Sequence, residues 1–193
     1  MKKLLTMLLG LFLISCATPP KYADISMTEP IQRKILRYSD NEHQIVISFV
    51  IKGHVGTYRN GDERRKTTLY PGINFNLMNN SDKNITIDWN EVWFILGNQS
   101  GYRIMHKETV NHECERQKDP TVILAKTYYS DIIIPCYSIQ PANYRFGPKW
   151  KNSMLPPVQT TQKVDFGVFL PLQFEGDETV NYKFMFRASG MQK

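Results

Sequence analysis

From residue 44 onward, apolar and polar residues alternate along most of the chain. In the run 45–51, Ile45, Ile47 and Phe49 occupy every second position. The same period of two recurs at 73–78, 85–90, 92–96, 102–105, 164–170 and 180–187. Because successive side chains of a β-strand point to opposite faces, this period predicts strands with one buried face. No segment keeps apolar residues at helical spacing over twelve positions, so we expect no helix in this part of the chain.

Short polar segments separate these runs and predict turns. Residues 79–84, 97–101 and 175–178 are rich in Asn, Asp, Ser and Gly, the residues that tight turns favour. Each is short enough to join its neighbouring strands as a hairpin. Alternating strands with short turns over about 150 residues predict an all-β fold, an antiparallel two-sheet β-sandwich over residues 41–193.

Two stretches break this rhythm. Residues 53–69 are polar and predict a long loop or an edge hairpin. Residues 137–163 contain several prolines, and Tyr144, Phe146 and Trp150 are among their aromatic residues. A loop of this length is uncommon unless it serves a function, and its aromatic residues need burial or a partner. Trp150 is therefore a candidate partner-binding residue, with a tryptophan capping one end of the core as the alternative.

The first residues resemble an export signal. Lys2 and Lys3 precede an apolar run over residues 4–14, which is too short to span a bilayer. The sequence Leu13-Ile14-Ser15-Cys16 resembles the lipobox of bacterial lipoproteins. The resemblance implies that residues 1–15 are a signal peptide and that the Cys16 sulfur carries a diacylglycerol, with an acyl chain on the new amino terminus. Two or three chains would hold the protein stably on a membrane.

The residue after the cysteine bears on the location. Ala17 stands where an aspartate commonly keeps such lipoproteins at the inner membrane. The resemblance therefore implies a lipid anchor in the outer membrane, facing the periplasm. Residues 16–40 contain Pro19, Pro20 and Pro30, and we expect them to form the lipidated N-terminus and a tether. A short strand or edge segment near 31–38 is the open alternative.

A second resemblance covers the strand region. Residues 71–80, 85–90 and 101–106 are similar to uncharacterised bacterial envelope lipoproteins with an immunoglobulin-like sandwich. The similarity continues weakly through 131–135 and 164–187. It implies a fold and a location, and it implies no catalytic residue.

Composition and charge restrict the class of partner. The chain has 193 residues, 41% hydrophobic and 12% aromatic, which suits one globular domain and excludes a disordered chain. Removing the two lysines of the leader changes the balance from 24 − 18 = +6 to 22 − 18 = +4. An exported, mildly basic chain is not expected to bind nucleic acid. The densest basic cluster contains Arg59, Arg64, Arg65 and Lys66. It is either a solvated loop or an ionic contact to lipid or to an acidic partner.

The remaining cysteines predict a disulfide. If Cys16 is lipidated, Cys114 and Cys136 form an even pair in an exported chain. The alternative is a zinc site that adds His106 and His112, but their spacing differs from compact zinc modules. We therefore expect no metal and no cofactor beyond the lipid on Cys16.

No catalytic set stands out in the sequence. His106, Ser130 and Asp131 have the composition of a triad, but no nucleophile motif accompanies them. Asp82, Asp88 and Glu91 lie near one predicted hairpin without a reason to converge. We expect a protein without enzymatic activity.

Three hypotheses for the function follow. The leading one is a lipid-anchored cell-envelope protein that binds or braces another envelope protein. A narrower alternative is a lipoprotein subunit of a secretion or conjugation apparatus, which neighbouring genes would reveal. The third is a metal-binding protein or enzyme that uses His106 and His112.

Overall fold

A computed structural model describes most of the chain. The described residues are 23–30, 36–60, 63–98, 101–109, 114–140, 149–150, 153–155 and 162–190. Among these, the side chains of 54–69, 139–140 and 149–150 are not described. The predicted signal peptide 1–15, Cys16 and His112 lie outside the described residues.

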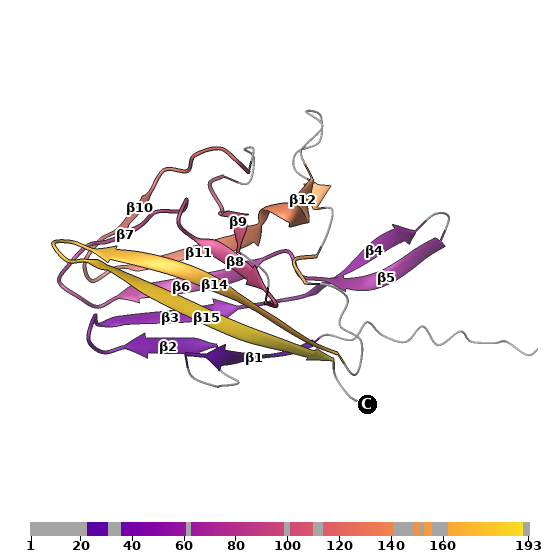
Figure 1. Cartoon of the computed structure of the whole chain (residues 1–193), viewed down its shortest axis with the longest axis horizontal. Coiled ribbons are helices and arrows are strands. Elements are labelled where there is room, and N and C mark those ends of the chain that lie inside the picture. The colour runs from indigo at the N-terminus through magenta and orange to yellow at the C-terminus, as the bar shows by residue number, and fades with distance from the viewer. Residues whose placement is uncertain are drawn as a thin grey trace, which may run out of the picture.

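These residues form fifteen strands and one 3₁₀ turn (Figure 1). In the first half of the chain the strands are β1 (Ala23–Glu29), β2 (Arg37–Asp40), β3 (Ile45–Val50), β4 (His54–Asn60), β5 (Glu63–Leu69), β6 (Ile73–Asn79), β7 (Ile85–Ile87) and β8 (Trp93–Leu96). The rest are β9 (Tyr102–Met105), β10 (Thr121–Ile123), β11 (Tyr128–Pro135), the turn η1 (Cys136–Ser138), β12 (Ile139–Gln140), β13 (Lys149–Trp150), β14 (Lys163–Phe174) and β15 (Thr179–Gly190). The predicted all-β class is confirmed.

Eleven of the strands form one antiparallel sheet. Its main path runs β1-β15-β14-β8-β9-β11-β6-β3-β2, and β7 joins it beside β14 and carries β10. Two separate pairs, β4 with β5 and β12 with β13, complete the described strands. The two longest strands, β14 and β15, pair over most of their length and form the centre of one half of the sheet.

The sheet curls so that its two halves pack against each other. Phe49 on β3 lies with its ring centroid 4.8 Å from that of Phe184 on β15, and 5.1 Å from that of Phe186. Tyr38 on β2 contacts Phe184 at 5.7 Å. Strands distant along the hydrogen-bonded path therefore share one core. Burial of these aromatic rings stabilises the curled form of the sheet.

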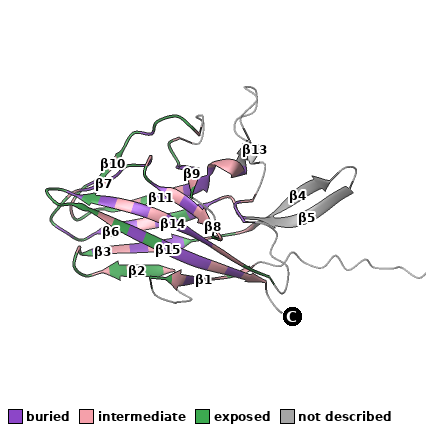
Figure 2. Cartoon of the chain, in the orientation of Figure 1, coloured by how far each residue is buried: buried purple, intermediate pink, exposed green. Residues whose placement is uncertain are grey.

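The period of two in the sequence corresponds to inner and outer faces. Along β6, the apolar residues Ile73, Phe75 and Leu77 are fully buried, while Asn74 and Met78 are exposed. Figure 2 shows the same alternation of buried and exposed positions along the strands. This is the pattern that a sheet with one covered face requires.

The turn over residues 79–84 does not close a hairpin, unlike those at 97–101 and 175–178. Strands β8 and β9 pair, as do β14 and β15, but β7 pairs with β10 and β14 and not with β6. The reason lies in the buried side chain of Asn79, whose Nδ2 donates to the carbonyls of Lys83 and Leu124 at 2.8 and 3.0 Å. These bonds hold the chain in a crossing from one half of the sheet to the other.

The N-terminal part of the sheet begins earlier than we expected. Residues 23–29 and 37–40, which we placed in a tether, form the edge strands β1 and β2. Met27 on β1 is fully buried, and this burial fixes the strand. Residues 53–69 contain the hairpin β4–β5, the second of the two predicted alternatives. In Figure 1 this hairpin projects from the body of the sheet.

Candidate functional site

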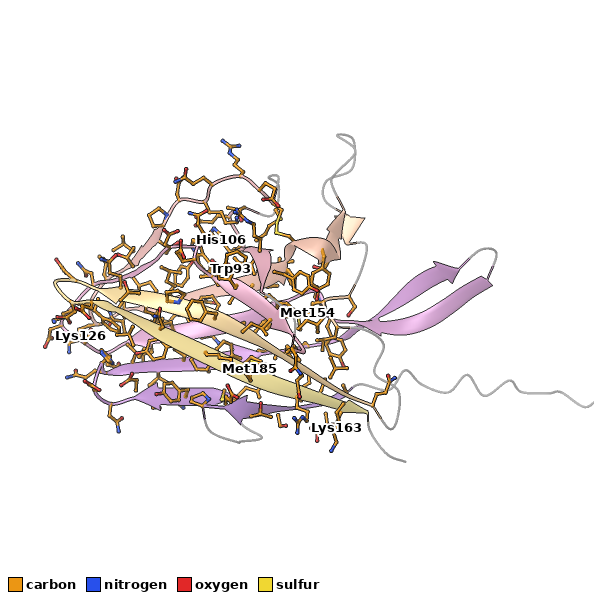
Figure 3. The ribbon with its side chains drawn as sticks, viewed as in Figure 1. Trp93, His106, Lys126, Met154, Lys163 and Met185 are labelled. Atoms are coloured by element: carbon orange, nitrogen blue, oxygen red, sulfur yellow. A yellow bond between two sulfur atoms is a disulfide. The ribbon has the colours of Figure 1, made fainter. Side chains whose placement is uncertain are left out.

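A buried polar network surrounds His106, which follows directly after β9. The side chain is 1% exposed, and its ring stacks on that of Trp89 with centroids 4.2 Å apart and planes within 7°. Its Nδ1 lies 3.1 Å from Oδ2 of Asp131 on β11. Strand pairing brings them near each other, because Met105, directly before His106, pairs with Ile134, which lies three residues after Asp131 on β11. Figure 3 labels His106 in this region.

The carboxylate of Asp131 is fully satisfied by donors. Its Oδ1 accepts from the backbone N–H of Lys107 at 2.8 Å and of Ile132 at 2.6 Å, and Oδ2 also accepts from the Tyr129 hydroxyl. Burial works against ionisation, but the hydrogen bonds from His106, Tyr129 and the backbone outweigh it and hold the pKa of Asp131 below its usual range. Burial and the bond to Asp131 raise the pKa of Tyr129 far above its ordinary value.

An ionised Asp131 fixes the proton on His106. A carboxylate can only accept, so Nδ1 of His106 must donate to it. In the neutral imidazole, Nε2 then carries a lone pair. Nε2 is buried and has no hydrogen-bond partner among the described residues. Nε2 can therefore accept one further hydrogen bond, which is the arrangement of a histidine backed by a carboxylate.

A polar pocket of about 310 Å³ adjoins this network. It is lined by His106, Glu108, Thr109, Arg116, Gln117, Lys118 and Asp119. On one side of the pocket, the Thr109 hydroxyl accepts from the His106 N–H at 3.1 Å and donates to the His106 carbonyl at 3.2 Å.

The wall of the pocket that residues 116–119 form is held by a buried lysine. Lys118 is 4% exposed, and its Nζ donates to the carbonyls of Cys114 and Arg116 at 3.2 and 3.3 Å. Burial lowers the pKa of Lys118, and the nearby Arg103 charge adds to this, while Glu115 opposes it. The backbone N–H of Lys118 also donates to Asn90 at 3.0 Å.

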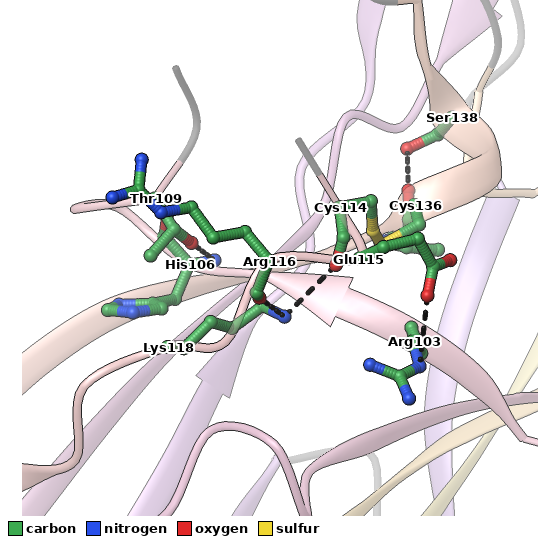
Figure 4. The surroundings of a disulfide bond; sticks show 10 residues. Arg103, His106, Thr109, Cys114, Glu115, Arg116, Lys118, Cys136 and Ser138 are labelled. Carbon is green, nitrogen blue, oxygen red and sulfur yellow. Dashed lines mark hydrogen bonds and ion pairs between the residues drawn. A yellow bond between two sulfur atoms is a disulfide. The ribbon is translucent and has the colours of Figure 1, made fainter. Parts of the chain in front are cut away.

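Cys114 and Cys136 lie together as a disulfide pair beside this wall (Figure 4). Their Cα atoms are 5.8 Å apart, within the range that a bridge needs. The pair ties the segment 114–118 to the end of β11, which also carries Asp131. The two cysteines are thus brought together as the sequence predicts.

The structure separates the members of the considered triad. Ser130 is exposed on β11, and Asp131 next to it is buried, because neighbouring strand residues face opposite sides. His106 therefore meets Asp131 and not Ser130. Among the described residues, no group of three or more His, Cys, Asp or Glu side chains is placed to hold a metal ion.

The carboxylates considered as an acid–base set serve local roles. Asp88 Oδ1 accepts from the backbone and side-chain nitrogens of Asn90 at 2.9 and 2.8 Å. Asp82 forms an exposed ion pair with Lys126 at 2.9 Å. The N–H of Glu91 donates to the carbonyl of Asp88, which closes the turn between them.

A second feature lies at the end of the sheet where β1 begins. The N–H of Ala23 donates to the hydroxyl of Tyr70 at 2.8 Å, and Tyr70 directly follows β5. The Tyr70 N–H donates to the Ser153 hydroxyl at 2.8 Å, and the N–H of Met154 donates to the Tyr70 carbonyl at 2.8 Å. Tyr70 is 4% exposed, so it is a buried junction between the first strand, the hairpin and the segment after β13.

Three candidate partner-binding residues belong to elements near this junction. Arg64 and Arg65 lie on β5, and Trp150 lies on β13, where it pairs with Ile139. Their side chains are outside the described residues. Figure 3 labels Met154 near the base of the hairpin, which agrees with its bond to Tyr70.

These features define an all-β domain with a polar pocket on one side and a hairpin junction at one end. Comparison of the chain with protein-family models, with curated proteins and with solved structures finds no match. The described part of the chain has no helix with the length and apolar character to cross a membrane.

Sequence reasoning missed several residues of the network. Trp89 ends an alternating run, and the sequence predicts only that it is buried. Lys118 gives no signal, because it sits in a polar segment where an exposed lysine is ordinary. Asp131 is the one residue of the network that the sequence marks in advance. It is a charged residue in an apolar strand, between a serine and three isoleucines.

Proposed function

We propose that the protein is a lipid-anchored component of the bacterial cell envelope, without enzymatic activity, that binds or braces another envelope protein. In this proposal the curled sheet is an immunoglobulin-like two-sheet sandwich. The anchor is the acylated Cys16, in the outer membrane and facing the periplasm. The lipobox-like sequence 13–16 is the reason for the anchor, because charge, apolar run and cysteine occur in the order that lipidation requires.

The junction at Tyr70 is the structural observation that carries the proposal. Ala23 begins β1 and is bonded to Tyr70 at the base of the hairpin β4–β5. Only residues 17–22 separate Ala23 from Cys16, and six residues reach at most about 20 Å when extended. Acyl chains on Cys16 would therefore hold this end of the sheet close to the membrane. The pocket at His106 and the outer faces of the sheet stay free for a partner.

The packing of the sheet supports the sandwich. The half that contains β15 and β14 and the half that contains β6 and β3 cover a common core, with Phe49 against Phe184 and Phe186. Antiparallel strands with one covered face are the elements of such folds. The disulfide pair Cys114–Cys136 agrees with an oxidising compartment.

Position sixteen gives the decisive test. In the native host, the wild-type protein should lose residues 1–15 and gain the mass of its acyl chains, and Cys16→Ser should show neither change. Ser15→Ala is the matched control, because it keeps a small residue before the cysteine and should be lipidated normally. Mass spectrometry measures all three. An intact, unmodified leader on the wild-type protein would overturn the anchor.

The binding part of the proposal is tested separately. Crosslinking and pull-down from membranes with the lipidated protein should recover an envelope protein. Recovery of no partner, together with turnover of a substrate by the purified protein, would contradict a non-enzymatic binding role.

A further inference from the structure

The register of the hairpin β4–β5 sorts its charges by face. Arg59 pairs with Arg64, and Thr57 pairs with Lys66. Residues that pair across antiparallel strands lie on the same face, and each neighbour along a strand lies on the other. Arg59, Arg64 and Lys66 therefore fall on one face of the hairpin, which we call the basic face.

The opposite face has a different charge balance. It contains the pair Tyr58–Arg65 and the pair Asn60–Glu63. The acidic residue of the described hairpin thus falls on the face away from the three cations. The sequence alone lists Glu63, Arg64, Arg65 and Lys66 as a mixed run, and only the pairing separates them.

The basic face gathers three cationic residues and no acidic residue of the described hairpin. Arg59 is the register partner of Arg64, and Lys66 follows two residues further along the strand. A face of this composition is complementary to an anionic surface. A surface is the suitable shape, because the three residues are spread along a strand pair that projects from the body of the sheet (Figure 1).

The position of the hairpin indicates which anionic surface is near. Tyr70, at the end of β5, is bonded to Ala23, which lies seven positions after Cys16. A seven-residue strand is about 24 Å long, comparable with the reach of about 20 Å for residues 17–22. The hairpin is therefore within reach of the membrane that holds the anchor.

We propose that the basic face of the hairpin docks on anionic phospholipid headgroups of the membrane that holds Cys16. This inference rests on the proposed lipid anchor. The acyl chains would keep the protein on the bilayer, and Arg59, Arg64 and Lys66 would set its orientation by laying the hairpin along the surface. The rest of the sheet would then face away from the lipid, toward a partner.

Vesicle binding by the mature chain without acyl groups tests the contact. The protein is residues 16–193 with Cys16→Ser, which keeps every described strand. It should sediment with vesicles that contain phosphatidylglycerol and not with vesicles of phosphatidylcholine alone. Raising the salt from about 0.1 M to about 1 M shortens the Debye length from about 10 Å to about 3 Å and should abolish binding.

Two neighbouring arginines provide a matched pair of variants. Arg64→Gln removes a charge from the basic face and should weaken binding about fivefold. Arg65→Gln removes the same charge from the opposite face and should weaken binding less than twofold. Equal melting temperatures of the two variants show that folding is not the cause of a difference.

Three results would overturn the contact: no binding to phosphatidylglycerol, equal losses in the two variants, or crosslinking of the hairpin to an acidic protein with no binding to phosphatidylglycerol. The anchor is judged by the mass of the wild-type protein. Failure of the anchor and failure of the lipid contact are therefore separate outcomes.

Discussion

At the residue scale, the buried carboxylate of Asp131 has a hydrogen-bond donor on every side. Asp131 accepts four hydrogen bonds, two from backbone N–H groups, one from Tyr129 and one from His106. A buried carboxylate is tolerated only when its charge is compensated in this way. Because two donors lie on β11 and the other two directly follow β9, the network fixes how the residues after β9 pack against β11.

Replacing Asp131 should change both the stability and its pH dependence. The folded state lowers the pKa of Asp131, so its stabilising contribution is complete above the unfolded pKa of about 4 and is lost as the pH falls through the folded value. We expect Asp131→Asn to reduce the free energy of unfolding by about 3 kcal/mol at pH 7. The loss relative to wild type should shrink as the pH falls through the lowered pKa of Asp131, because the wild-type side chain then becomes neutral, as the Asn side chain already is.

Urea unfolding across the acid range measures this prediction. Asp82→Asn is the control, because Asp82 forms an exposed pair with Lys126, and exposed pairs contribute less than about 1 kcal/mol. Equal unfolding free energies for Asp131→Asn and wild type at pH 7 would contradict the role given to the network.

At the element scale, residues 114–118, between β9 and β10, are held by a disulfide pair and by side-chain hydrogen bonds rather than by strand pairing. Residues 114–118 form no strand, and they are held by the disulfide pair with Cys136 and by Lys118. The ammonium of Lys118 bonds the carbonyl of Cys114 itself. One wall of the polar pocket is therefore attached to the end of β11 through these two contacts.

Reduction of the disulfide between Cys114 and Cys136 should lower the stability of the fold. The two cysteines are 22 positions apart, and closing a loop of that size stabilises by about 3 kcal/mol in the chain-entropy model. We expect a phosphine reductant to lower the free energy of unfolding of the wild-type protein by this amount. The double variant Cys114→Ser, Cys136→Ser should be equally weak with and without the reductant. A wild-type protein that is insensitive to reduction would show that no bridge is present.

At the scale of the whole molecule, the fold depends on contacts between the two halves of the curled sheet. Phe49, near the amino-terminal edge, packs against Phe184 and Phe186, which lie more than 130 positions later in the chain. Both partners of these contacts are fully or almost fully buried. The last strand must therefore be in place before the first half of the core is complete.

A double-mutant cycle tests this coupling. Phe49→Ala and Phe184→Ala should each cost about 3–5 kcal/mol, and the double variant should fall short of the sum by about 1 kcal/mol. Phe174→Ala is the control partner, because Phe174 packs on His43, at the other end of β14. It lies eight residues, or about 26 Å, from Phe166, the residue of β14 that packs on Phe186 beside Phe49. Additive losses for Phe49 with Phe184 would contradict direct packing between the halves.

Much of the strand content could be predicted from the sequence, because burial of one face imposes a period of two on every long strand. For β2 the sequence left a short edge strand near 31–38 as one alternative and did not fix its bounds, since the residues of β2 are half-buried or exposed and show no strong pattern. The pairing of β7 with β14 also escaped it, because the bonds of Asn79 that direct the crossing reach Leu124, 45 positions away.

The sequence by itself determined the all-β class, the faces of the long strands and the pairing expected for Cys114 and Cys136, since each depends on local periodicity or on counting. Only the tertiary structure decided that His106 meets Asp131 and not Ser130, that Lys118 is buried, and that the first strand begins beside the basic hairpin. These are consequences of which strands pair and in what register, and register is set by contacts between residues far apart in the chain.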